Sequence, residues 1–338
     1  MISIEVIRKP ILADLEAFDN FVADNFSAEG EMLQDMLTYA LSSRGKGVRP
    51  ILTMLAASMC GSTATTDDEQ CGRERHCSKR TYLAAMLVEM IHTASLIHDD
   101  VLDGADERRG KPSVNAKWQS DTAIILGDYI LARTMSLGMA SAQYDLVSYV
   151  GSAMATLCEG EVLQSQHANR FDTTRNDYFD IIYRKTASLL GVAAALGALS
   201  VGASREEVDR MRKFGEAIGM AFQIQDDILD YNRQNNTGKP VNNDLREHKI
   251  TLPLIEVMER ETAERRAEIV ASLRRCDVDE AAVDELQRVV DEGRGAEFAS
   301  ETMHAYLSRA MHLLAKYPES PYRAALMNLC TFIAERDK

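Results

Sequence analysis

The sequence predicts an all-α protein, and three observations support this. Long stretches rich in Ala, Leu, Met and Glu repeat their apolar residues with the period of a helix. Only seven prolines occur in 338 residues, and short glycine-containing or polar joints separate the helical stretches. Runs that alternate β-branched and polar residues, as strands do, are absent. No Pro-, Ser- or Gly-rich linker divides the chain, so we expect a single domain spanning residues 1–338.

Five helices are predicted in the first half of the chain, over residues 11–26, 31–42, 50–59, 81–102 and 122–142. The third follows a glycine-rich joint, and Pro50 is expected at its first position because the proline ring suits a helix start. The stretches before the fourth and fifth helices, 61–79 and 104–117, are polar and charged. We expect both to be surface loops.

The second half continues the helical pattern. Helices are predicted over residues 144–168, 177–201 and 206–231. Residues 232–248 are rich in Gly, Asn and Lys and are expected to form a mobile loop over a site. Shorter amphipathic helices are expected over 252–336, where Glu and Arg pairs at helical spacing indicate a solvated face.

Composition excludes several classes of partner. A net charge of -14 argues against nucleic acid and anionic membranes as main partners. No apolar run approaches the length that spans a bilayer, and the N-terminus lacks a signal-peptide pattern, so we expect a cytoplasmic protein. The six cysteines are scattered and are expected to be reduced thiols.

Two acidic motifs carry the chemistry that the sequence predicts. Each ends a predicted helix, and their aspartates are Asp99, Asp100 and Asp103 in the first motif and Asp226, Asp227 and Asp230 in the second. On a helix, residues i and i+4 share a face, so each motif places like charges side by side and needs a cation. Carboxylate oxygens suit Mg²⁺, which recruits substrate phosphates to complete its shell. The motifs therefore predict a paired Mg²⁺–diphosphate site.

The alternative interpretation of one such motif is an exposed acidic helix end, but its repetition with matching apolar neighbours favours a site. Basic residues stand beside the motifs, and such side chains hold phosphate oxygens. They are Lys46, Arg49, Arg108, Arg109, Lys185, Lys239 and Lys249, with Thr186 beside Lys185. Taken singly, each of these lysines and arginines is more often an ordinary surface cation. Their clustering at the ends of the motif-bearing helices favours diphosphate binding.

With these motifs, the chain resembles a trans-isoprenyl diphosphate synthase of the polyprenyl synthetase family over about residues 43–253, and within this family it is expected to be a long-chain member. The resemblance rests on His98-Asp99-Asp100-Val101-Leu102-Asp103 followed by Arg108-Arg109-Gly110, and on Phe222-Gln223-Ile224-Gln225-Asp226-Asp227-Ile228-Leu229-Asp230. It implies an isoprenoid-synthase-type helical bundle around a central cavity, and a homodimer. Two departures are Arg44 and Gly47 around the first lysine, and the lack of a glycine near Val241 or His248. Neither removes a charge that the resemblance assigns to catalysis.

The resemblance also implies roles for individual residues. Those implied to bind Mg²⁺ are Asp99, Asp103 and Asp226, supported by Asp100, Asp227 and Asp230. Those implied to contact the allylic diphosphate are Arg108, Lys185, Gln223 and Lys249, with Thr186 and Lys239 in the wider substrate set. Those implied to hold isopentenyl diphosphate are Lys46, Arg49, His92 and Arg109. The catalytic set expected from these is Asp99, Asp103, Asp226, Arg108, Lys185 and Lys249.

The implied reaction is Mg²⁺-dependent head-to-tail condensation of isopentenyl diphosphate onto dimethylallyl, geranyl, farnesyl or a longer allylic diphosphate. The allylic C–O bond breaks to a carbocation and diphosphate, so no protein nucleophile is needed. Family knowledge implies that the departing diphosphate takes the proton, so neither His92 nor His98 is expected to be the base. For His98 we favour a packing role.

Product length is expected to depend on the helix face beneath the first motif. Stepping back from Asp99 by helical turns gives Ser95, Ala94, Ile91 and Val88, and one turn of about 5.4 Å is close to one isoprene unit. Short-chain members of the family commonly have a bulky residue nearest the metals, so Ala94 and Ser95 predict an open floor and a product longer than C20. The alternative is that these small residues only permit close helix packing.

Other functions remain open from the sequence. A short-chain farnesyl or geranylgeranyl diphosphate synthase would share the motifs. A class I terpene cyclase usually pairs one such motif with a different second metal motif and needs no Lys46–Arg49 set. A silent regulatory subunit typically loses aspartates, and here all six are present. A helical scaffold protein would leave the repeated motif unexplained.

Overall fold

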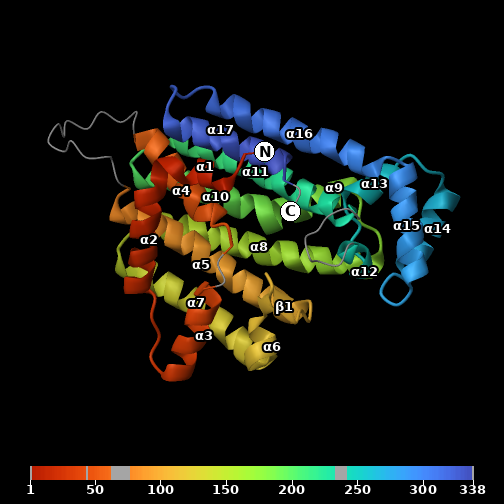
Figure 1. The fold of residues 1–338 in the computed structure, drawn as a ribbon, viewed down its shortest axis with the longest axis horizontal. Coiled ribbons are helices and arrows are strands. Elements are labelled where there is room, and N and C mark those ends of the chain that lie inside the picture. The colour runs from red at the N-terminus through yellow and green to blue at the C-terminus, as the bar shows by residue number, and fades with distance from the viewer. Residues whose placement is uncertain (1, 43–44, 62–76, 233–241, 337–338) are drawn as a thin grey trace.

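Helices make up nearly all of the computed structural model, which describes residues 2–42, 45–61, 77–232 and 242–336 (Figure 1). The first elements are α1 Ile4–Arg8, a 3₁₀ turn Lys9–Ile11, α2 Leu12–Asn25, α3 Glu31–Ser42, α4 Val48–Gly61, α5 Lys79–Leu102, β1 Glu107–Arg108, β2 Lys111–Pro112, α6 Val114–Trp118, α7 Ser120–Ala140 and α8 Tyr144–Arg170. Then follow α9 Arg175–Ile182, the π turn η2 Tyr183–Ala187, α10 Ser188–Ser200, α11 Arg205–Asp230, α12 Asn243–Arg246, α13 Leu252–Met258, α14 Ala263–Leu273, α15 Glu280–Glu292, α16 Gly295–Leu314 and α17 Pro321–Ala334.

The predicted all-α class is confirmed, and most long helices lie where the sequence placed them. Three details differ. α4 begins at Val48, so Pro50 is its third residue; proline fits there because the first N–H groups of a helix lack intrahelical partners. The predicted loop 104–117 contains the hairpin β1–β2 and the start of α6, and α1 was not predicted.

The predicted helix 177–201 is interrupted. α9 and α10 are joined by the five-residue π turn η2, which contains Lys185 and Thr186. A π turn inserts an extra residue into a helix and often occurs at a functional site. Hydrophobic periodicity did not reveal it, because the apolar pattern continues on both sides.

α10 forms the centre of the core, and 12 of its 13 residues are buried. It packs against α4 on one side and α11 on the other, while α16 covers α11 (Figure 1). A Cβ at Gly197 would lie 2.2 Å from the carbonyl oxygen of Thr53, and one at Gly215 would lie 2.3 Å from that of Leu190. These glycines therefore let α4, α10 and α11 approach closely.

The remaining helices build outward from this centre. α5 lies between α4, α10 and α7, and its C-terminal end reaches the hairpin β1–β2. The backbone N–H of Ile2 donates to Oε2 of Glu335 at 3.2 Å, so the N-terminal segment lies against α17. α14 and α15 form a pair at the opposite end of the molecule from α2 (Figure 1). Buried apolar side chains from α1 to α17 form one cluster.

The sequence was expected to contain no apolar run long enough to span a bilayer. By length and composition, this expectation was wrong. Two helical stretches in the described part of the chain, Ser120–Ala140 and Arg175–Ser200, are long and apolar enough to cross a bilayer. The second is 78% buried inside the protein, as a core helix must be. The first is 33% buried, so much of its apolar side faces outward.

Candidate active site

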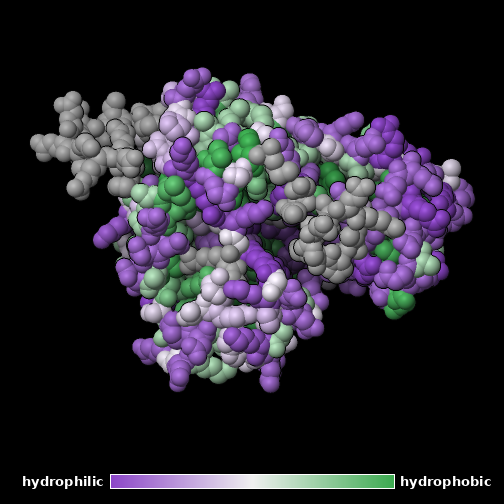
Figure 2. Space-filling model, viewed as in Figure 1, coloured by the Kyte–Doolittle hydropathy of each residue, from purple (hydrophilic) through white to green (hydrophobic). Residues whose placement is uncertain are grey.

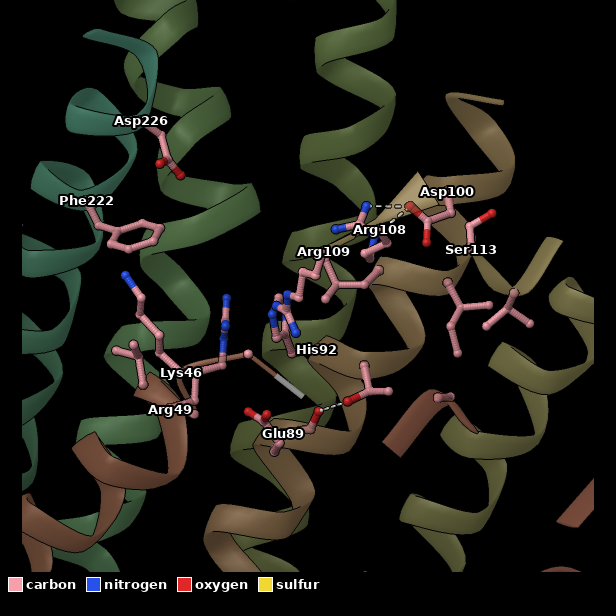
Figure 3. A pocket seen from close by; sticks show the side chains of 18 of the residues that line it. Lys46, Arg49, Glu89, His92, Asp100, Arg108, Arg109, Ser113, Phe222 and Asp226 are labelled. Atoms are coloured by element: carbon pink, nitrogen blue, oxygen red, sulfur yellow. Dashed lines mark hydrogen bonds and ion pairs between the residues drawn. The ribbon is translucent and has the colours of Figure 1, made fainter. Parts of the chain in front are cut away.

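Two cavities border the C-terminal end of α11. The larger, about 550 Å³, is here called the cationic cavity because of its basic lining residues. They are Lys46, Arg49, His92, Arg108, Arg109 and Arg336. Asp100 at the end of α5 and Asp226 at the end of α11 line the same cavity, so both acidic motifs contribute to it (Figure 3). The face in Figure 2 is hollowed near its centre, and hydrophilic side chains surround the hollow.

The second cavity, about 140 Å³, borders a neighbouring face of α11. We call it the mixed cavity because acids and bases both line it. Its charged and amide residues are Gln164, Lys185, Gln223, Asp227, Asp244 and Lys249. The structure thus gathers all four residues assigned to isopentenyl diphosphate in the cationic cavity. Of the four assigned to the allylic diphosphate, three line the mixed cavity and Arg108 lines the cationic one. Lys239 lies outside the described residues.

Each acidic motif ends its helix. Asp103 caps α5, and its backbone N–H donates to the carbonyl of Asp99 at 2.8 Å, which keeps the two aspartates one turn apart. α11 ends at Asp230. The C-terminal end of a helix carries partial negative charge, which adds to that of the carboxylates. Both helix ends therefore favour bound cations.

The hairpin β1–β2 turns a basic side chain back onto the first motif. Its turn passes through Arg109 and Gly110, which have φ of 56° and 75°. Arg108 donates from Nε and Nη2 to Oδ1 of Asp100, both at 2.6 Å. Asp100 is only 2% exposed, and a carboxylate this buried requires such a partner. Asp100 therefore anchors Arg108 at the cavity wall.

Asp99 lies in a different environment from Asp100. Burial is the main cause that raises the pKa of the Asp99 carboxyl to about 6, and the charge of Glu161 on α8 adds to the effect. Lys185 and Arg108 oppose the shift. A cation bound beside Asp99 would oppose this shift, because a nearby positive charge favours the ionised carboxylate.

In the second motif, Asp227 ends a chain of hydrogen bonds. The Thr186 hydroxyl donates to Oε1 of Gln223 at 2.8 Å, and Nε2 of Gln223 donates to Oδ1 of Asp227 at 2.9 Å. The hydroxyl of the buried Tyr178 donates to Oδ2 of Asp227 at 2.6 Å. Burial raises the pKa of Asp227 to about 6, although both hydrogen bonds act to lower it. Both oxygens of Asp227 thus have protein partners.

Asp230, the last residue of α11, holds the start of α12 in place. Its two carboxylate oxygens accept the backbone N–H groups of Asn243 at 3.1 Å and Asp244 at 3.0 Å, at the start of α12. Its carbonyl accepts the N–H of Asn242 at 2.9 Å. Asp230 therefore fixes α12, which directly precedes Lys249.

Lys249 sits among acids. Burial acts to lower its pKa, but the charges of Glu247, Asp244 and Asp103 together raise it above its ordinary value. Lys249 forms an ion pair with Glu247. The influence of Asp103 shows that this lysine from the second half of the chain lies near the first motif.

Asp226, the first aspartate of the second motif, forms an ion pair with Arg336 near the C-terminus. The guanidinium carbon of Arg336 lies 4.3 Å from the ring centre of Phe222, and Nε2 of Gln225 donates to the Arg336 carbonyl at 2.8 Å. Burial lowers the pKa of Arg336 to about 10. A cation already occupies the position beside Asp226.

Glu89 on α5 is a second deeply buried acid, besides Asp100, among the bases of the cationic cavity. Burial lowers the pKa of Arg49 to about 10; Glu89, which is 5% exposed, opposes this shift. Burial, together with Arg49, Arg109 and Arg108, lowers the pKa of His92 well below its ordinary value, so its imidazole is neutral. Figure 3 places Glu89 and His92 on consecutive turns of α5.

The donor set fits Mg²⁺. Among the described residues, no three His, Cys, Asp or Glu side chains converge closely enough to hold a metal alone. Mg²⁺ does not need such a cage, because it binds one or two carboxylates and completes its shell with waters and substrate phosphates. Asp100, Asp227 and Asp230 are engaged by Arg108, by Tyr178 and Gln223, and by the α12 amides. Asp226 is likewise paired with Arg336, so it would bind Mg²⁺ only after that ion pair opens, and Asp99 and Asp103 are the better candidates for ligands.

His98 and the product-length residues lie away from the two cavities. Nε2 of His98 lies 3.3 Å from the carbonyl of Ile124 and 3.5 Å from Oδ1 of Asp128, both on α7. This agrees with the packing role that we favoured. Val88, Ile91 and Ala94 are buried and Ser95 is half-buried, and none is among the residues that line either cavity.

Several partners of the predicted residues were missed from the sequence. They are Glu89, Glu161, Tyr178, Asp244 and Arg336. Glu89 stands one helical turn before His92, which was a usable signal. The others meet their partners through tertiary contacts that no local pattern encodes.

Comparison with known proteins agrees with this geometry. A model of the polyprenyl synthetase family matches residues 30–290. The all-trans-nonaprenyl-diphosphate synthase (geranyl-diphosphate specific) of Rhodobacter capsulatus is 34% identical over 98% of this chain and 97% of its own. The heptaprenyl diphosphate synthase component 2 of Geobacillus stearothermophilus is 33% identical over 96% and 99%. The crystal structure of a polyprenyl synthase from Caulobacter crescentus, complexed with calcium and isoprenyl diphosphate, has a TM-score of 0.87, with 28% identity over 100% and 99%. The resemblance found in the motifs is confirmed, and this chain belongs to the polyprenyl synthetase family.

Proposed function

We propose that this chain catalyses Mg²⁺-dependent head-to-tail condensation of isopentenyl diphosphate onto an allylic diphosphate, and that its all-trans product is longer than C20. Membership of the family makes the chain a prenyltransferase, and relatives named for nonaprenyl and heptaprenyl products support the length. The observation that carries the proposal is that one aspartate of each acidic motif, Asp100 and Asp226, lines one cavity together with six basic side chains.

The reaction uses two diphosphates, and each of the two cavities would hold one of them. In the cationic cavity, Lys46, Arg49 and Arg109 would bind the diphosphate of isopentenyl diphosphate. In the mixed cavity, Lys185, Gln223 and Lys249 would bind the allylic diphosphate, with Arg108 reaching it from the other side. Arg can bind phosphate oxygens in pairs, whereas Lys contributes a point charge. Lys239 keeps its predicted substrate role, although it lies outside the described residues.

Asp99, Asp103 and Asp226 would hold Mg²⁺, which supplies charge stabilisation to the leaving diphosphate. The basic side chains hold that diphosphate in place as its C–O bond breaks, which is electrostatic catalysis by prearranged charges. Neutral His92 would donate a hydrogen bond to isopentenyl diphosphate. Its strongly lowered pKa makes it a poor proton acceptor, in keeping with the expectation that no histidine is the base.

The test of the activity is direct. Purified protein is incubated with isopentenyl diphosphate, Mg²⁺ and allylic primers from dimethylallyl to geranylgeranyl diphosphate, and the hydrolysed products are sized by chromatography. Products longer than C20 are expected. Products that stop at C15 or C20 would identify a short-chain synthase, and failure of all primers to react would reject the proposal.

We propose that the chain length of the product depends on Ala94 and Ser95. Both are small and lie on α5 within two turns of Asp99. Ala94→Phe and Ser95→Phe should each shorten the main product by one or more isoprene units. Val88→Phe, two turns further along the helix, should shorten it less. An unchanged product distribution in all three variants would show that these positions only serve packing.

We also propose that the protein is a cytoplasmic homodimer that uses α7 as its interface. Ile124, Ile125 and Met139 on α7 are 42%, 63% and 52% exposed, and apolar patches of this kind mark interaction sites. Light scattering should give twice the chain mass, and Ile125→Asp should give monomers. A protein that is monomeric and needs a second polypeptide for activity would instead be one component of a heteromer, and recovery in the membrane fraction would point to α7 as a membrane contact.

A further inference from the structure

An ion pair lies where α8 meets the π turn η2. Nζ of Lys185 lies 2.8 Å from Oε2 of Glu161, and the two side chains are 22% and 23% exposed. Lys185 also lines the mixed cavity. Glu161 therefore lies directly behind a cation that faces the proposed allylic site.

The backbone around this pair is fixed by close packing. A Cβ at Gly160 would lie 3.1 Å from Cγ and from the backbone nitrogen of Lys185, and 2.7 Å from Cβ of Arg184. α8 thus runs directly against the lysine stem. The π turn on the other side changes the helical register at residues 183–187, so that Thr186 hydrogen-bonds to Gln223 on α11 while Lys185 pairs with α8.

We propose that Glu161 is a positioning residue that holds the Lys185 ammonium where the allylic diphosphate binds. An ammonium has three donors, so pairing with one Glu161 oxygen leaves two for phosphate oxygens. A lysine stem has four carbons and many rotamers, and fixing it in advance reduces the ordering cost of substrate binding. This inference rests on the proposed function, because it assigns Lys185 to the allylic diphosphate.

Glu161 also keeps Lys185 away from the first acidic motif. The charges of Glu161 and Lys185 both act on Asp99, so the three groups are neighbours. Without Glu161, Asp99 would be the carboxylate left to attract the ammonium. Lys185 would then move toward a proposed metal ligand and away from the substrate.

The chain contains a matched control one position from Lys185 on η2 and two positions from Glu161 on α8. Arg184 of η2 pairs with Glu159 of α8, with Nη1 and Oε2 2.5 Å apart. The Glu159 side chain is 63% exposed, compared with 23% for Glu161. Glu159→Gln removes an ion pair between the same two elements without touching the cavity, so it measures the purely structural effect.

The experiment compares Glu161→Gln, Glu161→Asp, Glu159→Gln, Lys185→Ala and the double variant Glu161→Gln/Lys185→Ala. KM is measured for the allylic diphosphate and for isopentenyl diphosphate. Glu161→Gln should raise the allylic KM about tenfold, and Glu161→Asp should recover part of this loss. The KM for isopentenyl diphosphate should stay within about twofold. The double variant should be no worse than Lys185→Ala, because Glu161 acts through Lys185.

Binding of an unreactive allylic thiodiphosphate, measured by calorimetry, should weaken in parallel with KM, and thermal unfolding should be similar for Glu161→Gln and Glu159→Gln. The inference is overturned if Glu161→Gln behaves like Glu159→Gln, or if the double variant shows the product of the two single effects. Failure of the proposed function looks different, because the unmodified protein would then not condense any primer.

Discussion

The two acidic motifs have the same sequence pattern, but their surroundings differ. In the first, the middle aspartate is bound by Arg108 from a neighbouring hairpin, and Asp103 is exposed. In the second, the middle aspartate is bound by Tyr178 and Gln223, and Asp230 caps α12. The first motif is thus built around charge and the second around neutral donors. A repeated motif therefore need not have the same function at each position.

The largest effects are expected where the motifs are alike. Asp99→Asn and Asp226→Asn should each reduce kcat/KM by at least about 1000-fold, because each removes a carboxylate proposed to hold Mg²⁺. Incorporation of labelled isopentenyl diphosphate measures this. Asp209→Asn, on α11 but outside both cavities, serves as the control. If either variant kept a tenth of the activity, its aspartate would not be a required ligand.

The middle aspartates should separate the motifs. Asp100→Asn should lower kcat/KM about 10- to 100-fold, mainly by raising the allylic KM, because it releases Arg108. Asp227→Asn should lower kcat/KM by a similar factor, and Tyr178→Phe should reproduce part of this loss. At the first motif, the corresponding partner of Asp100 is the charged Arg108 rather than a tyrosine. Steady-state kinetics on the three variants test this. In the double variants, Tyr178→Phe should lower the activity of Asp100→Asn but have little further effect on Asp227→Asn. Equal effects in both double variants would contradict this difference between the motifs.

Substitutions of the last aspartate of each motif, Asp103 and Asp230, should affect different properties of the protein. Asp230→Ala removes both acceptors at the start of α12 and should speed amide exchange at Asn243 and Asp244, with a local loss of about 1–2 kcal/mol. Asp103→Ala, at the same position of the first motif, should leave exchange in α12 unchanged while it lowers activity. Hydrogen-exchange mass spectrometry measures both. Slow exchange in α12 of the Asp230 variant would show that other contacts hold this helix.

The smallest effect concerns acid stability, which the two cavities should shift in opposite directions. The pKa of His92 is lowered in the folded state, so its contribution is present above about pH 6.5 and is lost as pH falls, by up to about 1.4 kcal/mol per pH unit. The pKa of Asp227 is raised to about 6, so its contribution is present below about pH 4 and is lost as pH rises through 6.

Urea unfolding between about pH 5 and 7.5 measures the His92 contribution. His92→Gln should flatten the loss of stability on the acid side, and Asp227→Asn should flatten the opposing trend. A slope for His92→Gln equal to that of the unmodified protein would mean that folding does not lower the pKa of His92.

The helices and the acidic motifs were predictable because their signals are local. Apolar periodicity located α3, α8 and α11 closely. The i, i+4 spacing picked out Asp99 with Asp103 and Asp226 with Asp230, and the third aspartate of each motif stands beside such a pair. The partners of those aspartates were not predictable. Arg336 lies 110 residues from Asp226, and Tyr178 lies 49 residues from Asp227, so only the tertiary fold brings them together. Local patterns therefore led to the candidate residues, and only the structure shows which partners surround each of them.

The π turn at Tyr183–Ala187 has a consequence for insertions and deletions in this stretch of the gene. Each residue of a regular helix rotates the next side chain by about 100°. Losing one codon within the turn would restore a regular helix, keep α10 in the core, and swing the side chains of Lys185 and Thr186 away from their present directions. Such a protein would be soluble and folded yet inactive, so length variants in this segment are more informative than its substitutions.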